Sequence, residues 1–183
     1  MKNLGSSRIP RAFLFLLIVA PAAGIISCSS SPDQPVVTLK EKNQMYQVQV
    51  NKNKWSYSDK NKFDLNSDAT FEFVHKNDDA YAMVISERIT FDSVDKLMEF
   101  VVGNLYEGAD SVEILDVDNR VVNGKEVSYL KTKAILNGLN LIYEGYYYTG
   151  KSGTIQFSTW TGENLFKEYE QDMMDLLNGL TIF

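Results

Sequence analysis

Few side chains in this sequence of 183 residues have the types and spacing that catalysis requires. His75 is the sole histidine, whereas a hydrolytic triad needs a base beside a nucleophile and a zinc site needs three or four ligands. No serine occupies a Gly-x-Ser-x-Gly motif that would mark a nucleophile. We therefore expect His75 to be a surface residue at the end of a strand, next to Lys76.

Two acidic segments contain carboxylates at spacings that metal sites use. Asp64–Asp68 resembles the first half of an EF-hand calcium loop, but Ala69 replaces the turn glycine and His75 stands where a bidentate glutamate belongs. A polar loop leading into a strand is the preferred interpretation. Asp116–Asp118 lies on a predicted strand within reach of Lys131, which favours a solvated row of charges. The sequence thus predicts no catalytic residue, no metal site and no cofactor.

Cys28 is the residue with the clearest chemical assignment. Three cations (Lys2, Arg8 and Arg11) precede an apolar run from Ala12 to Ile26, which is too short to span a bilayer and typical of a signal peptide. The run ends in Ile25-Ile26-Ser27-Cys28, which resembles the bacterial lipobox, whose cysteine is acylated with fatty acids such as palmitate. The alternative is a secretory leader cleaved nearby, with an incidental cysteine.

The segment after Cys28 is small and polar, and it contains Pro32 and Pro35, which block regular structure. We assign residues 1–27 to a lipoprotein signal peptide, 28–42 to the lipidated cysteine and a flexible tether, and 43–183 to the folded domain. Ser29 follows the cysteine in place of the aspartate that resembles an inner-membrane retention signal. The expected location is the bacterial envelope, at the outer membrane if two membranes are present.

Charge is distributed unevenly along the chain. The net charge is −6, and residues 63–183 carry nine basic and 21 acidic side chains, which argues against nucleic acid as a partner. The segment between Leu39 and Phe63 is instead basic. Its lysines either face the membrane or protect edge strands from aggregation; they are Lys40, Lys42, Lys52, Lys54, Lys60 and Lys62.

Hydrophobic periodicity predicts the elements of the domain. Alternation predicts strands at Met45–Val50, Thr70–His75 and Tyr81–Ile89, with Trp55 and Tyr57 in a connection. Apolar residues at helical spacing predict one helix from Val94, capped by Asp92 and ending at Gly108, and a second from about Glu163 to Asn178. Thr161 is the expected cap of the second helix and Gly179 its C-terminal glycine.

Four antiparallel strands are predicted between Glu113 and Trp160. Asn123-Gly124 and Asn137-Gly138 are typical two-residue hairpin turns, since both positions need a positive φ. Counting outward from the turns pairs Leu136 with Leu139, Ala134 with Leu141, Thr132 with Tyr143, Val117 with Leu130, and Leu115 with Thr132. The same register places Asp116, Lys131 and Glu144 in one row.

Both faces of this meander are apolar, so helices or loops are expected on both. Tyr129 should oppose Tyr146, with Tyr148, Phe157, Ile155 and Val127 beside them. This aromatic group is either core or a partner surface. Because two amphipathic helices are available as covers, we predict that Tyr146 and Phe157 are buried.

With these elements, the chain resembles the PsbP-like α/β/α sandwich family, which includes bacterial envelope lipoproteins of the DcrB type. The resemblance rests on Trp55 after the first strand, the hairpin Val122–Lys125, Gly150–Gly153 before the last strand, and a final helix followed by Leu180–Phe183. It implies an α+β fold with a single antiparallel sheet of about six strands flanked by helices. Known members act as extrinsic subunits or adaptors, so it implies binding rather than catalysis.

Two functions therefore remain open. The first is a non-enzymatic, lipid-anchored envelope protein that binds the membrane through acylated Cys28 and acts as an adaptor for an unidentified envelope protein. The second is a small-ligand receptor or hydrolytic enzyme that uses a pocket between the sheet and a helix. A polar concavity with converging carboxylates would favour the second.

Overall fold

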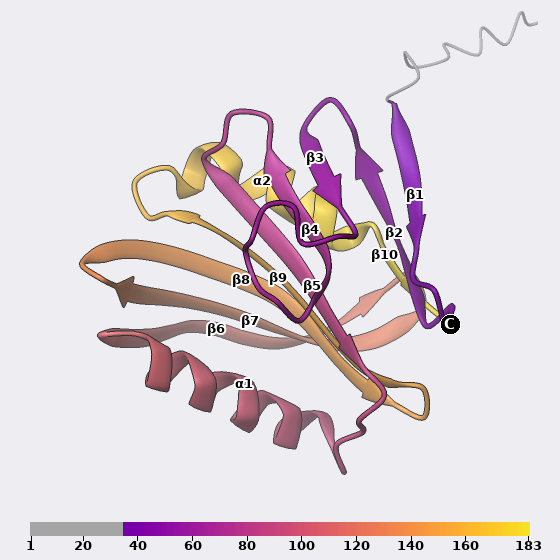
Figure 1. Cartoon of the computed structure of the whole chain (residues 1–183). Coiled ribbons are helices and arrows are strands. Elements are labelled where there is room, and N and C mark those ends of the chain that lie inside the picture. The colour runs from indigo at the N-terminus through magenta and orange to yellow at the C-terminus, as the bar shows by residue number, and fades with distance from the viewer. Residues whose placement is uncertain (1–34) are drawn as a thin grey trace, which may run out of the picture. The chain divides into compact units, whose positions relative to one another are not determined.

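The computed structural model describes residues 35–183; the predicted signal peptide, Cys28 and most of the predicted tether lie outside these residues. Ten strands and two helices are described, and Figure 1 shows their arrangement. In chain order they are β1 (Val36–Lys40), β2 (Tyr46–Asn51), β3 (Trp55–Ser58), β4 (Ala69–His75), β5 (Ala80–Glu87), α1 (Val94–Gly108), β6 (Ser111–Val122), β7 (Lys125–Leu136), β8 (Leu139–Gly150), β9 (Gly153–Gly162), α2 (Phe166–Asn178) and β10 (Leu180–Ile182).

The strands form two antiparallel sheets, so the prediction of a single sheet of about six strands is wrong. Seven strands pair in the order β3-β4-β5-β9-β8-β7-β6, and three more pair as β1-β2-β10. Residues 36–40, assigned to the tether from the sequence, form β1, and the segment beginning at Trp55 forms β3 rather than a connection. The second sheet depends on pairing between β2 and β10, which are more than 120 residues apart. Sequence alternation alone does not identify such a partner.

The predicted meander is confirmed with one shift in register. Asn123 and Gly124, and likewise Asn137 and Gly138, have positive φ as the hairpin turns require. The predicted partners Leu136–Leu139, Ala134–Leu141, Thr132–Tyr143 and Val117–Leu130 are all observed. The predicted pair of Leu115 with Thr132 is wrong, because a bulge between Ile114 and Asp116 makes Ile114 the partner of Thr132.

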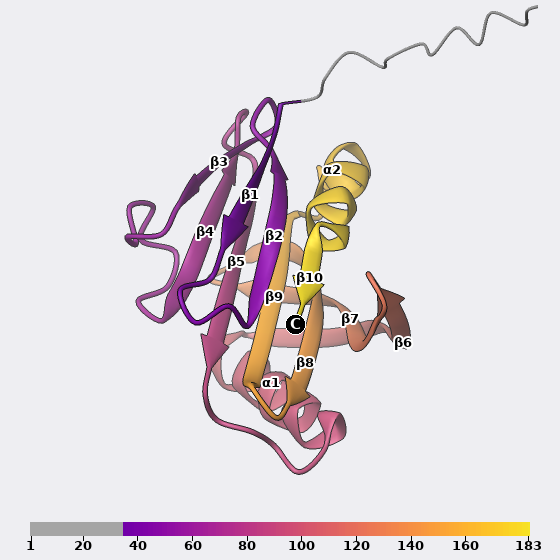
Figure 2. The same cartoon turned by 90° about the vertical axis from the view of Figure 1, so that its right-hand side faces the viewer.

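The two helices cover opposite faces of the seven-stranded sheet, as expected. Leu97 and Val101 of α1 pack with Leu130, whereas α2 packs in the cluster that holds Tyr129. Neighbouring residues of a strand point to opposite faces, so α1 and α2 lie on different sides of the meander. Figure 2 shows β1, β2 and β10 on the side of the molecule that carries α2, where they complete the larger cluster.

The aromatic group of the meander is core, which confirms the prediction for Tyr146 and Phe157. Tyr146 is 2% exposed and Phe157 is fully buried. Phe157 also lies 5.9 Å from the ring of Phe73 on β4, centroid to centroid. These contacts join the meander to the strands that precede α1.

The helix ends differ from the predicted ones in three ways. Ser93, not Asp92, is the N-cap of α1, and its side chain accepts a hydrogen bond from the Lys96 amide. The helix α2 begins at Phe166 after Leu165, without the predicted side-chain cap from Thr161. Gly179 does follow α2, but its φ of −70° is right-handed, so it is not the left-handed cap that glycine usually supplies.

Candidate functional site

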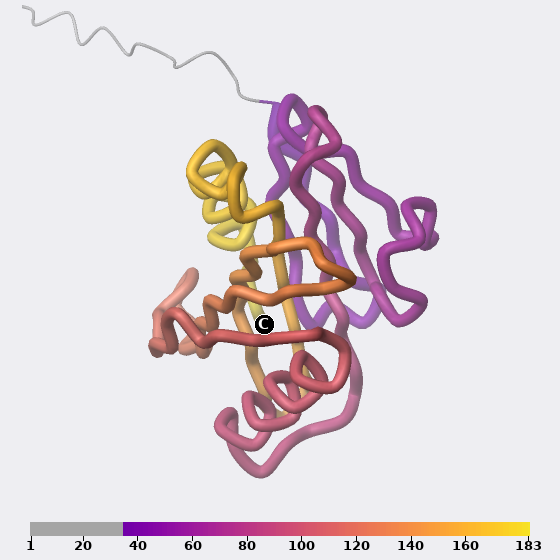
Figure 3. Tube along the Cα trace, turned by 90° about the vertical axis from the view of Figure 1, so that its left-hand side faces the viewer, coloured from indigo at the N-terminus to yellow at the C-terminus, as the bar shows by residue number. Residues whose placement is uncertain are grey.

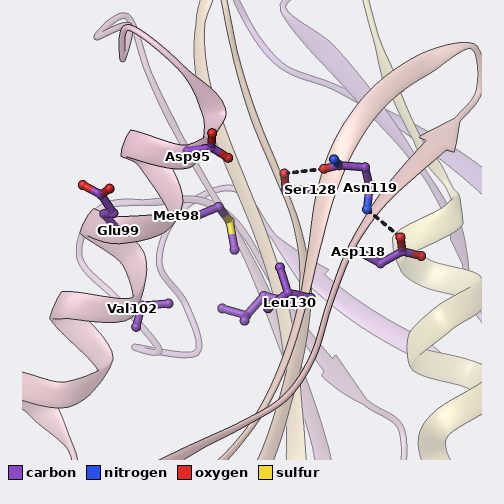
Figure 4. A pocket seen from close by; sticks show the side chains of 9 residues that line it. Asp95, Met98, Glu99, Val102, Asp118, Asn119, Ser128 and Leu130 are labelled. Carbon is purple, nitrogen blue, oxygen red and sulfur yellow. Dashed lines mark hydrogen bonds between the residues drawn. The ribbon is translucent and has the colours of Figure 1, made fainter.

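A groove between α1 and the β6–β7 hairpin is the main candidate for a binding site. Helix α1 buries two side chains, Leu97 and Val101, and leaves part of the sheet beyond them uncovered. The resulting cavity has a volume of about 510 Å³, and Figure 4 shows its walls. Its lining comes from α1 (Asp95, Met98, Glu99, Val102), β6 (Val117, Asp118, Asn119) and β7 (Ser128, Leu130).

The groove combines an apolar floor with an acidic rim. Met98, Val102 and Leu130 supply the apolar side chains, and Asp95 and Glu99 stand along the helix side (Figure 4). A hydrogen bond joins the two strands of the opposite wall: the Ser128 hydroxyl donates to Asn119 Oδ1 at 3.1 Å. Such a surface is complementary to a binding partner that presents an apolar group with a positive charge beside it.

The groove continues past the beginning of α1. A second hollow of about 650 Å³ shares Asn119 and Ser128 with the first and extends toward the turn at Gly124. Its other wall is formed by Phe91 to Val94, the segment that leads into α1. Because they share these two residues, the two hollows form one groove that is longer than either hollow alone.

Strand β6 adds an exposed edge beside this groove. It is the last strand of the seven-stranded sheet and lies next to α1 (Figure 3). Four of its apolar side chains are exposed; they are Ile114, Leu115, Val117 and Val121, the last at 71%. Sequence reasoning placed Val117 on an apolar face but did not identify this edge. The available signal was that β6 begins the meander, so the Asn-Gly turns give it only one neighbour.

The prediction that His75 lies at the surface is wrong, because His75 is buried beneath α2. Its Nε2 lies 3.1 Å from Asp172 Oδ2, and the Asn77 amide donates to its Nδ1 at 3.3 Å. A ring whose Nδ1 accepts carries its proton on Nε2, so His75 donates to Asp172. Lys54 pairs with the same carboxylate oxygen at 3.0 Å. The cluster holds α2 against β4, a structural role.

The Asp64–Asp68 segment is a loop that is organised by a buried carboxylate. Glu72, fully buried on β4, accepts hydrogen bonds from the amides of Phe63 at 3.0 Å and Leu65 at 2.7 Å. These bonds fold the loop back onto the sheet. Within residues 35–183, no group of three or more acidic, histidine or cysteine side chains is arranged to hold a metal ion.

The predicted row of Asp116, Lys131 and Glu144 is confirmed in register. Asp116 is exposed and Lys131 pairs with Glu170 of α2 at 3.2 Å, but Glu144 is buried. Burial raises the pKa of Glu144, although the Tyr129 hydroxyl donates to its Oε2 at 2.8 Å. Burial and the Glu144 carboxylate also raise the pKa of Tyr129. This row therefore passes from solvent into the core.

The six predicted lysines do not form a single cluster. Lys40 ends β1 and Lys42 lies in the connection from β1 to β2, whereas Lys52 and Lys54 lie at the other end of β2. The Lys52 amide donates to the carbonyl of Pro35 at 2.9 Å, which places it where the described chain begins. Lys60 and Lys62 follow in the connection from β3 to β4. In the described part of the chain, neither helix is long and apolar enough to cross a membrane.

Comparison with known proteins gives similarity at the level of the fold. No family model and no curated protein matches the sequence. The solution structure of CyanoP, the PsbP of the cyanobacterium Synechocystis, is similar with a TM-score of 0.59 and 13% identity, over 87% of this chain and 99% of CyanoP. This similarity shows that the domain has a PsbP-like fold.

Two other solved structures are similar to the same degree. LpqN of Mycobacterium tuberculosis, involved in cell envelope biogenesis, has a TM-score of 0.56 at 14% identity, covering 80% of this chain and 90% of LpqN. The Ran-binding protein Mog1p of Saccharomyces cerevisiae has a TM-score of 0.55 at 9% identity, covering 81% of this chain and 96% of Mog1p. At these identities, the likeness concerns the fold alone.

Proposed function

We propose that this protein is a lipid-anchored adaptor of the bacterial envelope that binds a protein partner through the groove between α1 and β6. The observation that carries the proposal is the continuity of the groove with the exposed apolar edge of β6. Contiguous exposed apolar surface beside polar residues is typical of protein interaction sites. The fold is shared with an envelope-biogenesis protein and a Ran-binding protein, which supports a binding role.

Site-specific photo-crosslinking tests this proposal. A photoreactive amino acid replaces Val117 in the groove or, as a control, Tyr57 on β3, an exposed residue at the other edge of the same sheet. In the native envelope, we expect a discrete crosslinked protein from position 117 and none from position 57. The same product from both positions, or none from position 117, would overturn the use of this groove.

The anchor is tested separately at Cys28. The proposal is that Cys28 is acylated after removal of residues 1–27, with location at the outer membrane if the cell has two membranes. A single acyl chain anchors only marginally, so more than one chain is expected. The variant Cys28→Ser should lose fatty-acid labelling and move to the soluble fraction. Labelling that persists in this variant would end the lipoprotein assignment, and with it the proposed kinship to DcrB-type lipoproteins.

The basic segment supports a smaller proposal about orientation. Lys52 lies where the chain enters the domain, so we place this end nearest the membrane. Each lysine near an anionic surface contributes at most about 1 kcal/mol, and salt screens it. The domain should bind anionic vesicles weakly and lose this binding at high salt. Replacing Lys52 should weaken it more than replacing Lys40, at the far end of the strands.

One feature of the cavity fits the alternative of a small-ligand receptor or hydrolytic enzyme. The cavity lies between the sheet and a helix, and about 510 Å³ is within the range of ligand sites. Its lining contains neither a histidine nor a cysteine, and the hydroxyl of Ser128 donates to Asn119 rather than to a base. The exposed edge continuing beyond the cavity favours a protein partner. Native mass spectrometry of the purified protein would reveal a retained small ligand.

A further inference from the structure

We infer that the partner contributes an extended segment that adds to the edge of β6, with apolar and basic side chains in alternation. This inference rests on the proposed function and specifies the chemistry of the partner. The relevant part of the edge is Asp116–Val121, which follows the bulge and pairs regularly with β7 on its other side. Six residues span about 20 Å at 3.3 Å per residue, enough for a short peptide strand.

An edge strand presents unpaired backbone N–H and C=O groups to an incoming strand. Within the described chain, β7 is the only strand that pairs with β6. Proteins commonly protect long edges with a bulge and with charges, and β6 has both at Leu115 and Asp116. Asp118 and Arg120 continue the charges along one face of the strand, whereas Val117 and Val121 on the other face are 58% and 71% exposed. An added strand would pair with this backbone and cover these side chains.

The two faces of the added strand would meet different surroundings. Val117 is paired with Leu130 and therefore points to the α1 side, where the groove has its apolar floor. Side chains of the partner on this face must be apolar to fill the groove. Because strand side chains alternate, the next residues of the partner point to the face that carries Asp116 and Asp118.

The second face requires positive charge. The side chains of Asp116 and Asp118 are 53% and 60% exposed, and both lie close to the same cation, Arg120, at 3.9 and 3.8 Å. Two carboxylates therefore share one guanidinium. Opposite charges directly across a strand pair are favourable and like charges unfavourable, so lysine or arginine on the partner fits this face.

The same charges argue against a second copy of this chain as the occupant. Pairing β6 with another β6 would bring two copies of Asp116, Asp118 and Arg120 to one interface, which places four carboxylates beside two guanidinium groups. Carboxylates facing one another across a strand pair are destabilising. Residues 63–183 are also strongly acidic, which favours a cationic partner over self-association.

Synthetic peptides test this inference with the whole chain as expressed. The probe is a labelled octapeptide of alternating lysine and valine, compared with alternating glutamate and valine, and with a block peptide of the same lysines and valines. A fourth peptide has the first sequence with N-methylated amides on alternate residues, which removes donors to a strand edge and keeps the charge. Fluorescence anisotropy at low and high salt measures the dissociation constants.

We expect the alternating lysine–valine peptide to bind at least about tenfold more tightly than each of the other three, which is about 1.4 kcal/mol. The double variant Asp116→Asn and Asp118→Asn should remove most of this preference and of the salt dependence. Asp59→Asn, in an exposed loop remote from β6, is the matched control and should bind as the original chain does. Amide chemical shifts of residues 116–121 should change on binding.

Three results would overturn the inference, and the first two leave the proposed function intact. The first is binding of the N-methylated and block peptides that equals binding of the alternating lysine–valine peptide, which would show simple charge attraction. The second is a crosslinked partner at position 117 in the envelope together with no binding of any peptide, which would show docking of a folded surface. The third is a dimer in sedimentation that protects the β6 amides from exchange, which would assign the edge to a second copy of this chain. Failure of the proposed function itself is distinct, since it appears as no crosslink at position 117.

Discussion

The two helices cover opposite faces of one sheet, and they do so to different extents. Five of the 13 residues of α2 are buried, whereas two of the 15 residues of α1 are buried. The exposed side chains of α1 include Phe100 and Tyr106, which are large and apolar. Both helices are amphipathic, so amphipathicity indicates that a helix has a covered face but not how completely the rest of the fold covers it.

The difference comes from the neighbours of each helix. Beside α2, the sheet of β1, β2 and β10 supplies Tyr46, Val48 and Leu180 to the same apolar cluster. On the other side, the cluster under α1 is limited to Leu97, Val101, Leu130 and Tyr147 at its centre. We infer that the α2 face stabilises the domain and that the α1 face is available for binding.

The largest effect is expected at the centre of the α2 face. Phe157→Ala should lower the free energy of unfolding by about 3–5 kcal/mol, since it removes a fully buried ring and leaves a cavity. Val117→Ala is the control on the α1 face, and it should change the free energy of unfolding by no more than about 0.5 kcal/mol. Chemical denaturation measures both. If Phe157→Ala unfolds like the original chain, the α2 face is not the stabilising one.

A smaller loss is expected for the corresponding truncation beneath α1. Leu97→Ala should cost about 2–3 kcal/mol, the lower part of the range for buried leucine, because the adjoining groove lets solvent reach the space left behind. Hydrogen exchange should show that α1 amides open at a lower free energy than α2 amides in the unmodified protein. Equal protection of the two helices would contradict the contrast between the faces.

The sequence predicted the parts of the fold that depend on local signals. The two Asn-Gly turns determine most of the meander register, because a two-residue loop leaves one pairing of the flanking strands. That register then placed Tyr146 and Phe157 on one face, where they are buried. Helical spacing likewise predicted α1 and α2, with errors confined to their ends.

Contacts between distant residues were not predictable in this way. His75 is buried beneath α2, where its Nε2–H donates a hydrogen bond to Asp172, and these residues are 97 positions apart. The bulge at Leu115 interrupts the regular pairing of β6 with β7, and no glycine in the sequence marks its position. The groove depends on where α1 crosses the sheet, and periodicity does not determine that position.

The pH dependence of stability provides a third test of the contrast, on the α2 face. Burial holds the pKa of Glu144 above its ordinary 4.5, so the folded state binds this proton more tightly than the unfolded state does. The stability that the protonated Glu144 side chain contributes is fully present below about pH 4.5 and is lost as the pH rises through the raised pKa. Relative to the original chain, Glu144→Gln should therefore become progressively more stable over that interval. A difference that is constant with pH would show that Glu144 is not buried as described.

The smallest effect is expected at the beginning of α1, where the groove starts. The Ser93 side chain accepts from the Lys96 amide at 3.3 Å, whereas α2 has no side-chain cap. Because α1 has few buried contacts, it depends more on this bond, and Ser93→Ala should cost about 1 kcal/mol of unfolding free energy. Asp92→Ala, at the cap position expected from the sequence, should cost only a few tenths through its charge near the helix N-terminus, about 0.3 kcal/mol. If Asp92→Ala is the costlier change, the cap lies one residue earlier and the helix side of the groove begins with it.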